Sequence, residues 1–274
     1  MAEAFVTLAT NDSYAFGAAT LAASLRRTGT SRHIVCMVTT GVSPLMRLCL
    51  ERFFDLLVPV DVFDSNDYAN LKLLGRPELG VTFTKLSCWR LTQYQKAVFL
   101  DADTLVVSSI DDLFEREEFS ASPDLGWPDC FNSGVFVFRP SNETYTKLVE
   151  FALSTGSFDG GDQGLLNSFF SDWATKDIAH HLPYVYNTAF AAAPYSYLPA
   201  LKHFFSDLKV VHFLGALKPW LFATDSSGKP LVPPNVDFHE CSMKLLHSWW
   251  EVYNSDVKCK LTEVCLFFLI FVFL

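Results

Sequence analysis

The sequence Lys96-Ala97-Val98-Phe99-Leu100 is apolar after its first residue and leads directly into Asp101-Ala102-Asp103-Thr104. A short, almost uninterrupted apolar run predicts a strand that is buried on both faces, and such strands are typical of parallel sheets covered by helices. Ligands of these sheets bind beyond the carboxyl ends of the strands. The two aspartates are therefore expected at a sheet edge where a ligand binds.

The rest of the chain alternates between strand and helix patterns. Strands are expected at residues 4–10, 33–39, 56–62, 133–139 and 209–213, and helices at residues 13–27, 43–53, 82–94, 142–153 and up to about 170. Asn11 and Asp12 are expected to cap the first helix. This alternation predicts an α/β fold with a mostly parallel central sheet. We expect one domain at residues 1–255 and a short tail at residues 256–274.

The composition narrows the class of protein. Of the 274 residues, 50% are hydrophobic and only 19% are charged, which excludes disordered and fibrous chains. The net charge of -9 makes nucleic acid an unfavourable partner. An acidic enzyme that holds an anionic substrate needs another source of positive charge, and a divalent cation is the simplest candidate.

The two ends of the chain and its cysteines point to the cytoplasm. No basic region followed by an apolar stretch precedes the first strand, as a secretory signal would require. The seven cysteines lack CxxC spacing and are expected to be reduced. Residues 264–274 are apolar, but a membrane-spanning helix needs about 20 residues, so this run is expected to dock on the protein or at an interface.

The two aspartates after the apolar strand are candidate metal ligands. Asp101 and Asp103 are two residues apart, so that in strand geometry both point to one side and can share a hard cation with diphosphate oxygens. The same pair of aspartates also occurs in solvated turns. The neighbouring sequence therefore decides whether the pair indicates a metal site. His212 ends another apolar strand and would supply a third ligand, although a single histidine there is more often a core residue.

Further polar residues are expected around this edge, and each taken singly also has an ordinary structural explanation. Gly215 and Lys218 would turn the chain and lay an amide and an ammonium against a phosphate. Asp159 and Asp162 flank two glycines at a helix start, where we expect one to cap the helix and the other to contact substrate. The remaining candidates for base, ribose, phosphate and hydroxyl contacts are Asn11, Tyr14, Arg76, Lys85, Asn132, Ser133 and Gln163.

Residues 189–199 carry two tyrosines, Tyr195 and Tyr197, between prolines and after a run of small residues. This composition suits a surface segment that presents a phenol, whereas the usual role of tyrosine is amphipathic packing.

Together these residues resemble the glycogenin family, the self-glucosylating starter enzymes of glycogen synthesis within glycosyltransferase family 8. The resemblance covers residues 4 to about 253. Its most specific segments are residues 5–12, residues 76–80, residues 99–104, residues 127–136, residues 156–164, residues 211–215 and residues 218–220.

The resemblance implies a GT-A (Rossmann-like) fold, UDP-glucose as donor, and Mn²⁺, with Mg²⁺ as an alternative, bound by Asp101, Asp103 and His212. It implies that Asp162 and Lys85 are catalytic and that Tyr195 is the glucose acceptor, with Tyr197 as the fallback. It also implies transfer with retention and a homodimer that acts on itself. The donor-binding positions that it implies are Leu8, Thr10, Asn11, Tyr14, Arg76, Lys85, Asp101, Ala102, Asp103, Asn132, Ser133, Asp159, Asp162, Gln163, His212, Gly215 and Lys218.

Two other functions stay open at this point. One is a family 8 transferase that acts on a free small acceptor, and the other is a poorly active isoform that only binds a nucleotide sugar or a partner. Glycogenins continue into a C-terminal segment that binds glycogen synthase, whereas this sequence ends in an apolar run. The expectation of glycogen synthase as a partner is left open for that reason.

Overall fold

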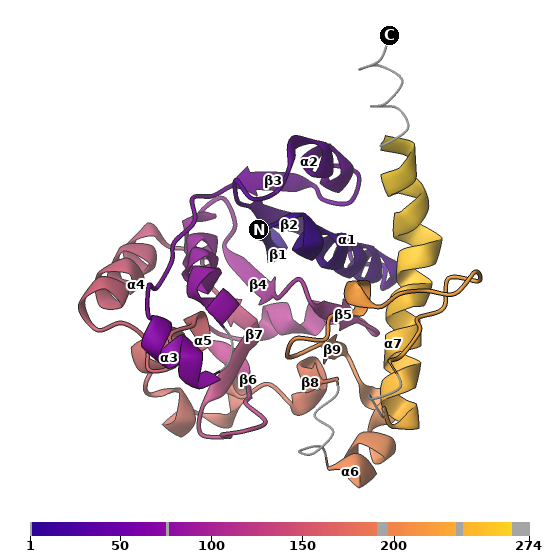
Figure 1. Ribbon diagram of the computed structural model, residues 1–274. Coiled ribbons are helices and arrows are strands. Elements are labelled where there is room, and N and C mark those ends of the chain that lie inside the picture. Colours follow the sequence, from indigo (N-terminus) through magenta and orange to yellow (C-terminus); the bar gives the residue numbers. More distant parts are fainter. Residues whose placement is uncertain (1, 75–76, 191–196, 234–237, 265–274) are drawn as a thin grey trace.

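The computed structural model describes residues 2–74, 77–190, 197–233 and 238–264 (Figure 1). A six-stranded sheet with the order β3-β2-β1-β4-β7-β6 forms its centre. The first four strands in this order are parallel, and β7 and β6 complete the sheet by antiparallel pairing. The sheet strands are β1 (Glu3–Ala9), β2 (His33–Val38), β3 (Leu56–Pro59), β4 (Lys96–Leu100), β6 (Ser120–Pro123) and β7 (Phe131–Phe138).

A second, three-stranded sheet lies beside the first. Its order is β5-β9-β8, with β5 (Thr104–Val106), β8 (Thr188–Ala189) and β9 (Val210–His212). The β5 strand begins directly after the two aspartates that follow β4. It pairs antiparallel with β9 in a register that sets Thr104 opposite His212. This pairing brings His212 next to Asp103 although more than a hundred residues separate them in the chain.

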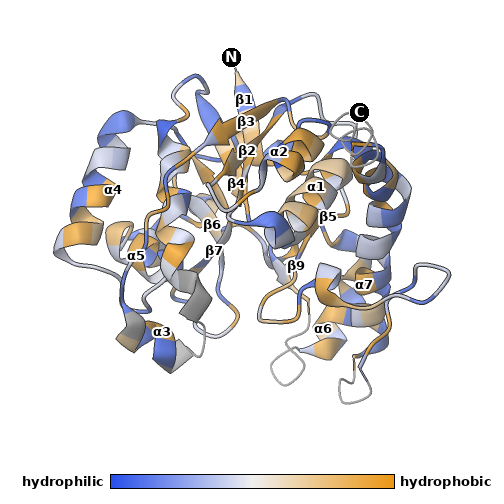
Figure 2. Ribbon diagram, turned by 45° about the horizontal axis from the view of Figure 1, so that its top comes forward, coloured by the Kyte–Doolittle hydropathy of each residue, from blue (hydrophilic) through white to orange (hydrophobic). Residues whose placement is uncertain are grey.

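Helices cover both faces of the central sheet (Figure 1). Because successive side chains of a strand point to opposite faces, β4 contributes Val98 to one hydrophobic core and Phe99 to the other. The first core also contains residues of α1 (Asp12–Arg27) and α7 (Glu240–Val252), and the second contains residues of α4 (Asn142–Ser154) and α5 (Asp162–Phe169). Apolar residues accordingly follow the strands, and hydrophilic residues lie on the outer faces of the helices (Figure 2). The other α-helices of the described residues are α2 (Pro44–Leu50), α3 (Tyr68–Leu74) and α6 (Leu198–His203).

The helix expected at residues 82–94 is instead a 3₁₀ helix, η1 (Pro77–Arg90). Gly80, Thr82 and Thr84 have low α-helix propensity, which accounts for the tighter winding. The other short helices are η2 (Asp111–Glu115), η3 (Trp173–Thr175), η4 (Ile178–His180), η5 (Tyr184–Tyr186), η6 (Phe205–Asp207), η7 (Pro219–Leu221) and the π-helical turn η8 (Tyr253–Val257).

The helical chain continues from α7 through η8 to residue 264. Val257 and Leu261 are buried in the same hydrophobic core as α1. The apolar run from residue 265 onward lies outside the described residues. Among the residues that are described, no helix has the length and apolar character needed to cross a membrane.

Candidate functional site

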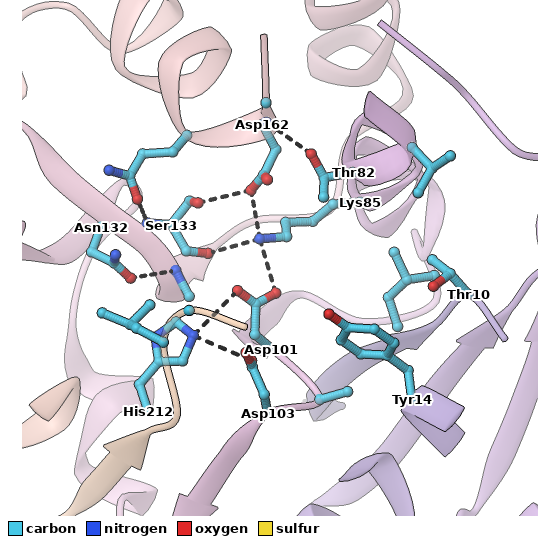
Figure 3. A pocket seen from close by; sticks show the side chains of 18 of the residues that line it. Thr10, Tyr14, Thr82, Lys85, Asp101, Asp103, Asn132, Ser133, Asp162 and His212 are labelled. Atoms are coloured by element: carbon cyan, nitrogen blue, oxygen red, sulfur yellow. Dashed lines mark hydrogen bonds and ion pairs between the residues drawn. The ribbon is translucent and has the colours of Figure 1, made fainter. Parts of the chain in front are cut away.

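A cavity of about 640 Å³ opens at the carboxyl ends of β1 and β4 (Figure 3). The amino end of β7 lies at the same edge because β7 runs antiparallel to β4. Every expected donor-binding residue that the structure describes lines this cavity. Its walls are formed by Leu8, Thr10, Asn11, Tyr14, Val81, Thr82, Lys85, Asp101, Ala102, Asp103, Asp124, Asn132, Ser133, Gly134, Asp159, Gly161, Asp162, Gln163, His212, Leu214, Gly215 and Lys218.

Three expected residues are not among those that the structure places in this cavity wall. Arg76 and Tyr195 lie outside the described residues. Tyr197 is described, and its side chain is exposed at the residue that precedes α6.

Asp101, Asp103 and His212 form a cluster of potential metal ligands. One ligand atom from each lies within 4.8 Å of the other two. Nε2 of His212 is 3.2 Å from Oδ1 of Asp103 and 3.8 Å from Oδ2 of Asp101. Two carboxylates and one imidazole are a donor set that Mn²⁺, Mg²⁺ or Zn²⁺ accepts. The residues therefore fit a divalent metal ion.

The two aspartates of this cluster have opposite pKa shifts. Burial raises the pKa of Asp101 to about 6, although Lys85 beside it opposes the shift. Burial acts in the same direction on Asp103, but Lys218 and His212 outweigh it and hold the pKa of Asp103 well below its usual range. Lys218 contacts Oδ2 of Asp103 and also donates to the carbonyl of Phe213 at 2.9 Å. Asp103 is therefore the more firmly ionised of the two.

Lys85 connects the metal cluster with Asp162 (Figure 3). Its Nζ lies 2.9 Å from Oδ1 of Asp101, 2.5 Å from Oδ2 of Asp162 and 3.2 Å from the carbonyl oxygen of Ser133. Burial alone would lower the pKa of Lys85, but the two carboxylates raise it well above its usual range. Lys85 is thus a permanently charged, buried cation between two anionic groups.

Asp162 is fixed at the start of α5 by three contacts. Besides Lys85, the hydroxyl of Ser133 donates to its Oδ2 at 2.8 Å, and its own backbone N–H donates to Oγ1 of Thr82 at 3.0 Å. The side chain is buried, and its charge lies in the first turn of α5, where the helix dipole favours an anion. A carboxylate held in this way is ready to interact with positive charge that develops in the cavity.

Neither Asp159 nor Asp162 occupies the cap position of α5, which is Gly161. The carboxylate of Asp159 nevertheless accepts from the backbone N–H of Gly164 in the first turn of the helix. It also accepts from the backbone N–H of Gly161 at 2.8 Å and from the hydroxyl of Ser157 at 2.7 Å. Its carboxylate shapes the turn before the helix because the two glycines bring that backbone within reach, and burial raises its pKa.

Asp124 is a cavity residue that was not expected from the sequence. Its Oδ2 accepts from Nδ2 of Asn132 and from Nε2 of Gln163, both at 3.1 Å, and so orients two amides on the Asp162 side of the cavity. Asp124 directly follows β6, which runs parallel to β4 because both pair antiparallel with β7. The sequence feature that could have identified Asp124 is its place at the carboxyl end of a strand. This strand is short, however, and its residues resemble a turn.

The opposite wall is built from the β1–α1 connection. Asn11 caps α1, as expected, by accepting from the backbone N–H of Tyr14 at 3.0 Å. The Tyr14 ring packs edge-on against Trp220 with the ring centroids 5.4 Å apart, and Trp220 donates to the hydroxyl of Ser13 at 3.0 Å. Thr10 and Tyr14 lie on one side of Asp101, and Asn132 and His212 lie on the other (Figure 3). The cavity thus extends from an end that holds Tyr14 and Asn11, past the metal cluster, to an end that holds Asp162 and the amides of Asn132 and Gln163.

Comparisons with known proteins agree with this architecture. The model of the family described as "Glycosyl transferase family 8" matches residues 5–118 and 115–224. Glycogenin-1 of Oryctolagus cuniculus is 55% identical over 255 residues, which are 93% of this chain and 76% of that protein. Glycogenin-2 of Homo sapiens is 54% identical over 256 residues, which are 93% of this chain and 51% of that protein.

Solved structures show the same fold at low sequence identity. The apo form of the glycosyltransferase GlyE from Streptococcus pneumoniae TIGR4 superposes with a TM-score of 0.61 at 20% identity, covering 96% of this chain and 63% of that chain. An active-site mutant of LgtC superposes with a TM-score of 0.60 at 17% identity, covering 92% of this chain and 95% of that chain.

The fold and the site define a retaining glycosyltransferase of the GT-A class with a cluster of candidate divalent-metal ligands at its centre. Within that class, the chain belongs to the glycogenin family of glycosyltransferase family 8.

Proposed function

We propose that this chain transfers glucose from UDP-glucose to its own Tyr195, or to Tyr197 if Tyr195 is not reached, and then extends it as a short α-1,4-glucan primer. The observation that carries the proposal is the joint presence, in one cavity, of the metal cluster and of the Lys85–Asp162 ion pair. Membership of the glycogenin family supports glucose as the sugar and the protein itself as the acceptor.

The dimensions and polarity of the cavity suit a nucleotide sugar that lies along its length. About 640 Å³ is within the range of small-molecule sites, which is roughly 300–1,000 Å³. Thr10, Asn11 and Tyr14 would contact the uridine, and Arg76 is expected to join them. Lys218 and the Gly215 amide would contact the diphosphate. Asn132, Ser133, Asp159 and Gln163 would contact the glucose.

Asp101, Asp103 and His212 would hold the metal ion, for which Mn²⁺ is the first candidate and Mg²⁺ the alternative. When bound, such an ion neutralises the negative charge that builds up on a diphosphate leaving group. Lys218 is close enough to Asp103 to add a second positive charge at the same place. Preorganised charges in a buried site stabilise a transition state more strongly than the same charges in water.

Asp162 would face the anomeric carbon, where positive charge develops as the bond to the diphosphate breaks. Its carboxylate would either stabilise that charge or form a transient glucosyl ester, since both roles are known for carboxylates in glycosyl transfer. Lys85 and Ser133 hold the carboxylate of Asp162 in place. A tyrosine phenol has a pKa of about 10, so its proton must leave as the new bond forms, and the departing phosphate oxygen is a suitable acceptor.

Intact-mass measurement of the purified chain, incubated with UDP-glucose and Mn²⁺, tests donor, metal and acceptor together. We expect a ladder of added hexose masses that disappears in the Tyr195→Phe, Tyr197→Phe double variant. A wild-type protein that hydrolyses or binds UDP-glucose but never gains hexose mass would contradict self-glucosylation.

The second candidate, transfer to a free small acceptor, is distinguished by the same double variant. Transfer from UDP-glucose to a free polyol would survive the loss of both tyrosines, whereas self-glucosylation would not.

A homodimer in which one subunit glucosylates the other is tested by mixing a Lys85→Met chain with the tyrosine double variant. Hexose mass that appears on the Lys85→Met chain supports transfer between subunits.

A further inference from the structure

Asn187 joins His212 of the metal cluster to Asn132 through side-chain hydrogen bonds. It is buried at the end of η5, and it does not itself line the cavity. Its Oδ1 lies 2.9 Å from Nδ1 of His212, and its Nδ2 donates to Oδ1 of Asn132 at 2.8 Å. Asn132 and His212 lie on the same side of the cavity (Figure 3). Asn187 can therefore act on the site only through these two neighbours.

The direction of this hydrogen-bond chain follows from one backbone group. The N–H of Gly134 can only donate, and it donates at 3.0 Å to the amide atom of Asn132 that also contacts Asn187. That atom is therefore the oxygen of Asn132, and it can only accept from Asn187. The atom of Asn187 that donates is its nitrogen, so its oxygen faces His212. An oxygen there requires that Nδ1 of His212 carry a proton.

A proton on Nδ1 determines what the other ring nitrogen offers. Nε2 of His212 is the atom that would bind the metal ion. It lies 3.2 Å from Oδ1 of Asp103 and 3.8 Å from Oδ2 of Asp101. With Nδ1 protonated, the neutral ring presents a lone pair on Nε2. With the other tautomer, Nε2–H would donate to the carboxylate of Asp103 and occupy the metal position. Only the Nδ1-protonated tautomer of His212 therefore leaves Nε2 free to bind a metal ion.

We propose that Asn187 is a positioning residue that holds His212 in the Nδ1-protonated tautomer, so that Nε2 is available to a divalent metal ion. The inference rests on the proposed metal-dependent function. It gives a role in that function to Asn187, which lies outside the cavity wall. Groups that orient metal-binding histidines typically change metal affinity or activity by about 10–100-fold when they are removed. Asn187 also donates to Asn132, which is a proposed glucose contact. One buried amide therefore contacts both a proposed metal ligand and a proposed sugar-binding residue.

The first test is Mn²⁺ binding to the whole chain, measured by the electron paramagnetic resonance signal of free Mn²⁺ without donor or transfer. Asn187→Leu keeps the size but removes the acceptor, and we expect Mn²⁺ affinity to fall by about 10–100-fold. Asn187→Asp keeps an oxygen toward His212 and should bind Mn²⁺ within about 10-fold of the wild type. The matched control is Thr188→Val, which removes a partly buried hydrogen bond of 3.0 Å to the carbonyl of Tyr184 in the same segment.

The second test reads the tautomer directly, in metal-free protein whose histidines are labelled with ¹⁵N. Two-bond ¹⁵N–¹H correlations should show a protonated Nδ1 for His212, identified by its absence from a His212→Gln variant. In Asn187→Leu we expect the proton to shift toward Nε2. An unprotonated Nδ1 in the wild type, or unchanged Mn²⁺ affinity in folded Asn187→Leu, would overturn the role of Asn187. Either result leaves the proposed transfer reaction intact, because that reaction is tested on the wild-type chain by hexose mass.

Discussion

The ammonium of Lys85 lies 2.5 Å from Oδ2 of Asp162, in a place where both side chains are almost fully buried. The same ammonium reaches Asp101 in the metal cluster at 2.9 Å. One lysine therefore neutralises a proposed metal ligand and the carboxylate that would face the anomeric carbon. Its removal is expected to affect both chemistry and stability.

Replacing Lys85 with Met should lower the rate of glucose transfer by about 100–1,000-fold, because a fixed charge in a buried site is lost. The measurement is the initial rate of hexose incorporation at saturating UDP-glucose. Lys96→Met is the matched control, since Lys96 donates to the carbonyls of Phe114 and Arg116 at 2.9 and 2.6 Å, away from the cavity. A Lys85→Met chain that transfers as fast as the control would contradict the role given to Lys85.

The stability of the Lys85–Asp162 pair should be strongly non-additive. Removing one partner of a buried ion pair leaves an unpaired charge and typically costs about 3–5 kcal/mol. We therefore expect Lys85→Met and Asp162→Leu each to reduce the free energy of unfolding in urea, and the double variant to lose clearly less than the sum. Additive losses would mean that the two side chains do not interact in solution.

Asp103→Asn should weaken Mn²⁺ binding by at least about 100-fold, because it removes a proposed ligand that is already ionised and held by Lys218 and His212. Chelation of the metal should stop hexose transfer by the wild type, and added Mn²⁺ should restore it. Asp225→Asn, in an exposed turn, is the control for the loss of one negative charge. Equal Mn²⁺ affinity in the two variants would rule out Asp103 as a ligand.

Gly134→Ala should displace His212. A Cβ atom at position 134 would lie 2.1 Å from Cε1 and 2.4 Å from Nδ1 of the His212 ring. Because the backbone fixes the position of an alanine Cβ, the ring itself would have to move. Overpacking of this kind typically costs about 1–3 kcal/mol, and here it should also weaken Mn²⁺ binding. Gly126→Ala is the comparison, since its nearest neighbour would be 3.3 Å away in an exposed turn. Wild-type Mn²⁺ affinity in Gly134→Ala would show that His212 does not need its present position.

Much of the site could be predicted because its signals are local. The apolar run of β4 and the aspartates behind it are adjacent in the chain, and the pattern of a buried strand fixes which end carries them. Asn11 as the cap of α1 was confirmed for the same reason, since capping depends on residues three apart. The mostly parallel sheet followed from the alternation of strands and helices and was confirmed for β1 to β4.

The residues that the sequence did not reveal depend on pairing between distant segments. Asp124 becomes a cavity residue only because short β6 pairs with β7. Asn187 becomes a neighbour of His212 because β8 pairs with β9 and η5 precedes β8. Neither residue lies in a pattern that differs from an ordinary turn, so no local signal singled them out.

The sequence by itself determined the α/β class and the types of side chain that a metal and diphosphate site needs, because periodicity and residue chemistry are properties of short segments. Only the tertiary structure decided which of these side chains meet, and which atom of each faces the cavity. Backbone pairing across about a hundred residues sets His212 against Asp103, and one buried amide then sets the direction of its proton. Hydrogen-bond directions in a buried network are fixed by all its members together, and the fold assembles those members from separate parts of the chain.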